Sequence, residues 1–147
     1  MTPLDELRII AALQRFVNAQ AGTYDQALAE VRAGRKRTHW MWYIFPQLAG
    51  LGHSPTAQFY GIADLDEATL YLDHLILGPR LILISQSLIA LPTSDPREVM
   101  GHPDDLKLRS SMTIFAHVPD THDIFQRVLH KFYGGLPDQV TLNLLTR

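Results

Sequence analysis

Signals that start and stop α-helices recur along the whole chain, and they constrain its fold more than any other feature. Capping side chains precede a proline, as at Asp95-Pro96, or stand three residues before a glutamate, as Asp64 does before Glu67. Glycine stops the segment that ends at Gly34. These signals predict helices over residues 2–18, 23–33, 54–60, 64–73, 80–90, 96–101, 103–115, 121–133 and 138–145.

Two of these starts rest on specific local patterns. Thr23 with Gln26 forms a predicted capping box, in which each side chain bonds the backbone amide of the other residue. Pro79 is expected to open the helix over residues 80–90, since proline fits the first turn of a helix.

Strand signals are scarce. Residues 40–45 read Trp-Met-Trp-Tyr-Ile-Phe, which is rich in β-formers, but the segment follows a helix end, runs into Pro46 and lacks apolar–polar alternation. A short buried helix or an extended segment are both compatible with it, and we favour the helix. The expected fold is therefore all-α, a single domain over residues 1–147 with about seven or eight short helices arranged like an orthogonal bundle.

Composition excludes several classes of function. The 147 residues include no cysteine, which excludes disulfides, thiolate catalysis and zinc sites built on cysteine. The net charge of −2 argues against a dedicated nucleic-acid binder. The longest uncharged apolar stretch, residues 81–94, is shorter than the roughly 20 residues that span a bilayer, so we expect a cytoplasmic protein without a membrane segment.

A first cluster combines cations, an imidazole and two indoles. Such groups suit an anionic ligand with a planar part, such as a nucleotide. A purely structural interpretation is also open, in which the cations complement a helix C-terminus and each indole fills the core with its N–H hydrogen-bonded. The cluster comprises Arg35, Lys36, Arg37, His39, Trp40, Trp42 and Gln47.

A second cluster lies on the predicted helix over residues 103–115. Asp104, Lys107 and Ser111 share one helical face, and a desolvated Lys107 would act as a base toward Ser110 or Ser111. The alternative is an Asp104–Lys107 ion pair with serines that bond helix carbonyls. A third interpretation gives the polar groups of this cluster a role in ligand binding. Those groups are Asp105, Lys107, Ser110, Ser111 and Thr113.

Metal and phosphate motifs are weak. No two of the seven histidines stand four residues apart, and His102 with Asp104 and Asp105 is the one cluster that resembles a metal site, so we predict no metal. The glycine turn at residues 50–52 is no phosphate-binding loop, and Ser54 beyond it is interpreted as an ordinary N-cap.

These motifs identify a family. The chain resembles, from about residue 16 to 145, the domain-of-unknown-function 1810 family of small, mostly bacterial proteins, some of which are labelled "calpastatin", a name that this sequence does not support. The resemblance implies a mainly helical fold and no particular activity. It rests on Phe16-Val17, Gln20, Tyr24, Lys36, His39-Trp40-Met41-Trp42, Phe45-Pro46-Gln47, Gly50-Leu51-Gly52, Asp105, Lys107-Leu108, Ser110-Ser111-Met112-Thr113 and Asp138.

We expect the two clusters to face each other and to line one pocket. Two lysines beside an indole suit an anionic, partly planar small molecule, with or without catalysis; the cofactor and the oligomeric state are not predicted. A protein-interaction domain, with tryptophan and arginine as an exposed anchor, is the alternative, and weak nucleic-acid binding through the arginines is a third. The predicted ligand-binding residues are Lys36, His39, Trp40, Trp42, Gln47, Asp105, Lys107, Ser110, Ser111 and Thr113.

Overall fold

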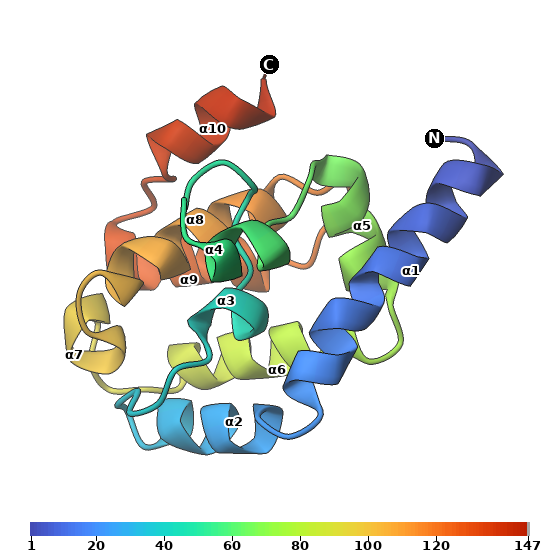
Figure 1. The fold of residues 1–147 in the computed structure, drawn as a ribbon. Coiled ribbons are helices and arrows are strands. Elements are labelled where there is room, and N and C mark those ends of the chain that lie inside the picture. The colour runs from blue at the N-terminus through green and yellow to red at the C-terminus, as the bar shows by residue number, and fades with distance from the viewer. Residues whose placement is uncertain (147) are drawn as a thin grey trace.

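The computed structural model describes residues 1–146, and all regular secondary structure in that range is helical (Figure 1). It confirms the all-α class. The helices are α1 (Pro3–Gln20), α2 (Tyr24–Arg32), α3 (Met41–Ile44), α4 (Pro55–Tyr60), α5 (Leu65–Asp73), α6 (Leu77–Ile89), α7 (Pro96–Met100), α8 (Asp104–Ala116), α9 (Ile124–Tyr133) and α10 (Gln139–Leu145). These ten correspond to the nine segments predicted from start and stop signals together with the short helix favoured over residues 40–45, so the expected total of seven or eight is too low. Three of them are very short: α3, α4 and α7 have four, six and five residues.

Most predicted N-caps form as expected. Ser54, Asp64, Asp95 and Asp138 each accept a hydrogen bond from a backbone amide in the first turn of the helix that they precede. The segment around Trp42 is the predicted short helix, α3.

One predicted capping box and two predicted helix starts are wrong. Thr23 makes no capping bond, because its hydroxyl donates to the carbonyl of Ala19 in the preceding helix. Helix α6 begins at Leu77, two residues before Pro79, where the Nδ1 of His74 accepts the amides of Ile76 and Leu77. Helix α9 begins at Ile124 rather than near Thr121.

Helices α6, α8 and α9 form the centre of the molecule. Helix α9 packs against both α6 and α8, while α2 and α5 pack on α6 (Figure 1). Their inward side chains form one continuous hydrophobic core, which includes Phe16, Trp40, Tyr71, Phe115 and Phe125. The short helices α3, α4 and α10 lie around this centre, where α3 packs against α1 and α4, and α10 packs against α8.

The helix directions are those of an orthogonal bundle. The axis turns by 88° between α5 and α6. Gly78 in α6 allows this close crossing, since a Cβ at that position would lie 2.0 Å from the carbonyl oxygen of Leu72. No single helix in residues 1–146 is long and apolar enough to cross a membrane; α5 and α6 pass that test only as a bent pair.

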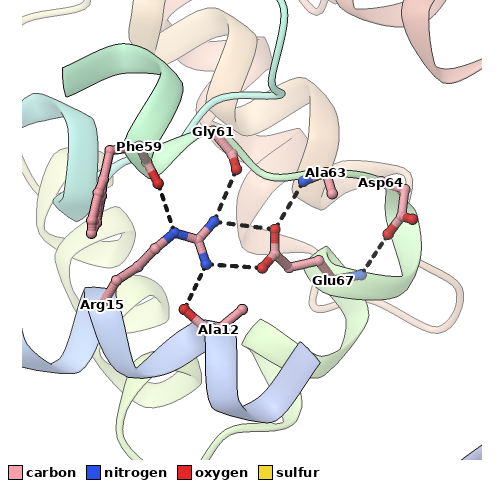
Figure 2. Close-up of polar contacts among 7 residues, drawn as sticks. All are labelled: Ala12, Arg15, Phe59, Gly61, Ala63, Asp64 and Glu67. Atoms are coloured by element: carbon pink, nitrogen blue, oxygen red, sulfur yellow. Dashed lines mark hydrogen bonds and ion pairs between the residues drawn. The ribbon is translucent and has the colours of Figure 1, made fainter. Parts of the chain in front are cut away.

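An arginine in α1 fixes the connection between α4 and α5. The guanidinium of Arg15 makes a two-pronged ion pair with the carboxylate of Glu67, with N–O distances of 3.0 and 3.3 Å (Figure 2). It also donates to the carbonyls of Ala12, Phe59 and Gly61, so all five of its N–H groups are used. The Oε1 of Glu67, which also accepts a bond from Arg15, accepts the amide of Ala63. Asp64 accepts the amide of Glu67, but the Glu67 side chain does not bond the amide of Asp64 in return, so the reciprocal capping box is incomplete.

The N-terminal half of α1 extends beyond the rest of the molecule (Figure 1). Residues 1–8 are all exposed, whereas Leu13 and Phe16 in the second half are fully buried. The exposed half carries a row of large apolar side chains with exposed fractions of 48–65%, comprising Met1, Leu4, Leu7 and Ile10.

Candidate functional site

The two predicted clusters meet at the carboxylate of Asp104, the first residue of α8. One oxygen of Asp104 lies 2.9 Å from the Nζ of Lys36, and the other lies 3.2 Å from the Nζ of Lys107. Lys36 comes from the loop after α2 and Lys107 from α8, so the two lysines are on the same side of the molecule. The ion pair between Lys107 and Asp104, which was the alternative to a Lys107–serine pair, is therefore present.

Each lysine also lies over an indole. The Nζ of Lys36 is 5.1 Å from the centre of the Trp40 ring, and the Nζ of Lys107 is 5.2 Å from that of Trp42. At this distance the negative face of the ring attracts the ammonium group. The two pairs differ in exposure, because the Lys36 side chain is 9% exposed and the Lys107 side chain is 28% exposed.

Trp40 belongs to the core. Its side chain is fully buried, and its Nε1 donates to the carboxylate of Glu30 at 3.0 Å. Glu30 also accepts the amides of Arg37 and Thr38 and the hydroxyl of Thr38. Burial by itself raises the pKa of the Glu30 carboxyl, but these hydrogen bonds outweigh it and lower the pKa from 4.5 to about 2. This loop is therefore held by a buried carboxylate that the sequence did not single out.

A hollow of about 320 Å³ lies between the segment 47–52, the first half of α8 and the start of α10. We call it the α8–α10 hollow. Of the predicted ligand-binding residues, Gln47, Lys107 and Ser110 line it, and Gln47 also lines a small adjoining depression together with Trp42. The full lining comprises Gln47, Leu51, Gly52, Pro103, Leu106, Lys107, Ser110, Asp138 and Val140.

The hydroxyls of α8 serve mainly the fold. Ser110 donates to the carbonyl of Leu106, and Thr113 donates to that of Arg109 while accepting the amide of Asp138. The Oγ of Ser111 is buried and has no hydrogen-bond partner among residues 1–146. With the Lys107 ammonium paired to Asp104, the structure shows no bond between this lysine and either serine.

The remaining predicted residues lie outside the hollow. His39 is exposed, and its carbonyl accepts the hydroxyl of Tyr43 at 3.4 Å. Asp105 pairs with the imidazole of His102, at 2.9 Å between Oδ1 and Nδ1, and its carbonyl accepts the hydroxyl of Tyr133. Burial, with the nearby Asp105 charge, raises the pKa of Tyr133 far above its usual value.

Within residues 1–146, no three His, Asp or Glu side chains lie close enough together to hold a metal ion.

Asp104 and Asp138 are the parts of the site that sequence reasoning undervalued. The i, i+3 spacing of Asp104 and Lys107 signalled their pairing, but nothing local shows that Lys36 completes it. Asp138 was expected only as a helix cap. It does cap α10, and its Oδ2 accepts both the amide and the hydroxyl of Thr141 while the residue lines the hollow.

Residues 10–145 match the family described as "Protein of unknown function (DUF1810)". The chain belongs to this family. The match includes all of α2–α10 and every residue of the α8–α10 hollow, while the first nine residues lie outside it.

A solved DUF1810 structure has nearly the same fold. It is the conserved hypothetical protein Rv1873 from Mycobacterium tuberculosis, which is 50% identical to this chain, with a TM-score of 0.90 over 92% of this chain and 96% of the other. A comparison with curated proteins gives no match. The DUF1810 family and this neighbour establish the fold and carry no activity over to it.

Proposed function

We propose that this DUF1810 protein binds an anionic, partly planar small molecule in the α8–α10 hollow, and that it does so in the cytoplasm of a bacterial cell. Nucleotide-like compounds are one class that fits this description. No catalytic group is assigned, because the Ser110 hydroxyl donates to the carbonyl of Leu106 and the buried Ser111 hydroxyl has no partner among residues 1–146, so neither bonds to a base.

The charge balance at Asp104 carries the proposal. Two ammonium groups, those of Lys36 and Lys107, share this one carboxylate, so the cluster keeps one positive charge in excess. Lys107 is the more exposed of the two and lines the hollow. A negative group on a ligand would restore the balance at the point where the indole of Trp42 lies beneath the ammonium.

The rest of the lining suits a compound with an apolar or aromatic body. Leu51, Leu106 and Val140 supply apolar walls, and Gln47 and Ser110 supply polar groups between them. The volume lies at the lower end of the range of about 300–1,000 Å³ typical of ligand pockets. Asp138 places a carboxylate in the same hollow, so the anionic end of the ligand belongs on the Lys107 side.

A thermal-shift screen tests this function. At a concentration about 100-fold above its Kd, a ligand adds about 2.7 kcal/mol of stability. For a chain of this size that corresponds to a rise in melting temperature of roughly 5–10 °C. The compounds to screen are inorganic phosphate, nucleoside mono- and diphosphates, sugar phosphates and aromatic carboxylates.

Two variants locate any compound that raises the melting temperature. Lys107→Met keeps the apolar stem over Trp42 but removes the charge, so it should abolish the ligand-dependent rise. Arg8→Met removes a cation on the exposed half of α1 and should leave the rise unchanged. The proposal is contradicted if no compound raises the melting temperature, or if every rise survives in Lys107→Met.

A further inference from the structure

A second hollow lies between the end of α2 and α7, and no predicted function uses it. It is open to solvent, has a volume of about 610 Å³ and is lined in part by Lys36, whose ammonium group pairs with Asp104. Its lining comprises Ala33, Gly34, Arg35, Lys36, Arg97, Glu98, Val99 and Gly101. We call it the α2–α7 hollow.

Two arginines in this hollow have no partner in the part of the chain that the structure describes. The guanidiniums of Arg35 and Arg97 form no ion pair or hydrogen bond with residues 1–146. The single acidic residue in the lining is Glu98, whose carboxylate accepts the hydroxyl of Thr93 at 2.6 Å. The residues that line the hollow therefore include two arginines with unpartnered guanidiniums and one carboxylate.

The end of α2 does not need these cations. The amide of Gly34 bonds the carbonyl of Val31, and that of Arg35 bonds the carbonyl of Glu30, with Gly34 in the left-handed conformation at φ +82°. The carbonyls of Glu30 and Val31, in the last turn of α2, are thus bonded by backbone amides. A role in neutralising the negative end of this helix is therefore not enough to explain the Arg35 side chain.

The two walls of the hollow are fixed to each other. The amide of Lys36 donates to the carbonyl of Val99 at 2.7 Å, which joins the loop after α2 to α7. On α7, Asp95 accepts the amides of Arg97 and Glu98, and the amide of Gly101 bonds the carbonyl of Arg97. The backbones that carry Arg35 and Arg97 are therefore held at a set separation before any ligand binds.

We propose that the α2–α7 hollow binds the phosphate group of a small molecule between the guanidiniums of Arg35 and Arg97. A guanidinium presents paired N–H donors that match two oxygens of one phosphate, and two guanidiniums balance its double negative charge. A concave site with walls fixed by backbone hydrogen bonds favours a single phosphate group over an extended polyanion, and the net charge of −2 disfavours a nucleic-acid surface. This site is separate from the α8–α10 hollow and does not rest on the function proposed there.

Titrations followed by ¹⁵N–¹H NMR spectra test the phosphate site on the full chain. The probes are inorganic phosphate and glycerol 3-phosphate, with ionic strength held constant by sodium chloride. We expect saturable shifts of the amide signals of residues 33–36 and 97–101. Arg35→Gln and Arg97→Gln should each weaken binding by about tenfold or more, and Arg35→Lys by less, since lysine keeps the charge but loses the paired donors.

A control variant and the position of the shifts separate this site from the other one. Arg8→Gln should bind both probes as the wild type does, and circular dichroism should show an unchanged helical spectrum for every variant, because all the altered arginines are exposed. The proposal fails if no saturable shifts appear in residues 33–36 and 97–101, or if the arginine variants bind unchanged there. It also fails if a short oligothymidylate binds these segments far more tightly than glycerol 3-phosphate does, which would identify a nucleic-acid backbone as the ligand.

Discussion

Glu30 shows how one buried carboxylate organises the loop that carries Lys36 and Trp40. It accepts four hydrogen bonds, from the amides of Arg37 and Thr38, the hydroxyl of Thr38 and the indole of Trp40. Buried ionised groups are tolerated when they are hydrogen-bonded in this way. The loop after α2 therefore depends on the charge of this side chain.

Replacing Glu30 with glutamine should lower the free energy of unfolding at pH 7 by about 1–3 kcal/mol. The side-chain amide of glutamine carries an NH₂ group, and this donor would face the four hydrogen-bond donors that already surround the site. The pKa of Glu30 in the folded protein is about 2, below the ordinary value of 4.5. The ionised carboxylate therefore makes its full contribution to the stability of the fold at pH values above 4.5. This contribution is lost as the pH falls from 4.5 toward 2. The difference between wild type and Glu30→Gln should narrow over the same range in urea unfolding curves.

Glu6→Gln is the matched control for this experiment. Glu6 is exposed on α1, so the same substitution there should change the free energy of unfolding by less than about 0.5 kcal/mol at every pH. A Glu30→Gln effect no larger than that of Glu6→Gln would show that the four hydrogen bonds contribute nothing net.

At the scale of single residues, the sequence predicted the type of group at the site better than its role. The cations and indoles of residues 35–42 were identified, and burial of Trp40 with its N–H bonded was one of the two interpretations. Glu30 was missed because its partners lie 7–10 positions further along the chain. The i, i+3 and i, i+4 spacings that bring helical side chains into contact do not connect these positions, and the turn at Gly34 lies between Glu30 and its partners.

Among the secondary-structure elements, α1 is tied to α5 by the Arg15–Glu67 pair. The side chains are 15% and 5% exposed, so each charge depends on the other for compensation. Arg15→Met or Glu67→Leu alone should lower the free energy of unfolding by about 3–5 kcal/mol, since each leaves a buried charge without its partner. The double variant should cost clearly less than the sum, and urea unfolding of all four proteins measures this difference. If the effect of the double variant equals the sum of the two single effects to within about 0.3–0.5 kcal/mol, the two side chains are not coupled.

The crossing of α5 and α6 depends on Gly78. An alanine Cβ at this position would lie 2.0 Å from the carbonyl oxygen of Leu72, so one of the two backbones must move. Although alanine favours helix by about 1 kcal/mol over glycine, we expect Gly78→Ala to lower the melting temperature by roughly 5 °C or more. Gly22→Ala is the control, because nothing lies within 4 Å of its Cβ. Equal melting temperatures for the two variants would contradict the close crossing.

Local signals account for which elements were predicted and which boundaries were wrong. Caps formed by Ser54, Asp95 and Asp138 need only the amides of the next turn, so the sequence is sufficient to predict them. Thr23 has the same chemistry, but its hydroxyl bonds Ala19 because α1 continues to Gln20. Helix α6 starts early because His74 accepts its first amides, a role that helix propensity does not encode.

For the whole molecule, the meeting of two distant segments was predicted, but not the shape of the site. Lys36 and Lys107 do converge, at Asp104. The hollow, however, is closed by α10 through Asp138 and Val140, and it excludes His39 and the buried Ser111. Periodicity indicates which face of a helix is polar, whereas the third wall of a pocket depends on how the helices pack.

Residues 3–8 of α1 are exposed and lie outside the family match, and they offer a test of where the stability of the whole molecule resides. Leu7 is 65% exposed and Leu13 is fully buried, although they are two turns apart on one helix. Leu13→Ala should lower the free energy of unfolding by about 2–5 kcal/mol, because it leaves a cavity in the core. Leu7→Gln should change it by less than about 0.5 kcal/mol, since the side chain already contacts water. Both effects are measured by urea unfolding at two protein concentrations tenfold apart. A loss in Leu7→Gln that grows with protein concentration would contradict this assignment, since it would mean that the apolar row is buried against another copy of the chain in solution.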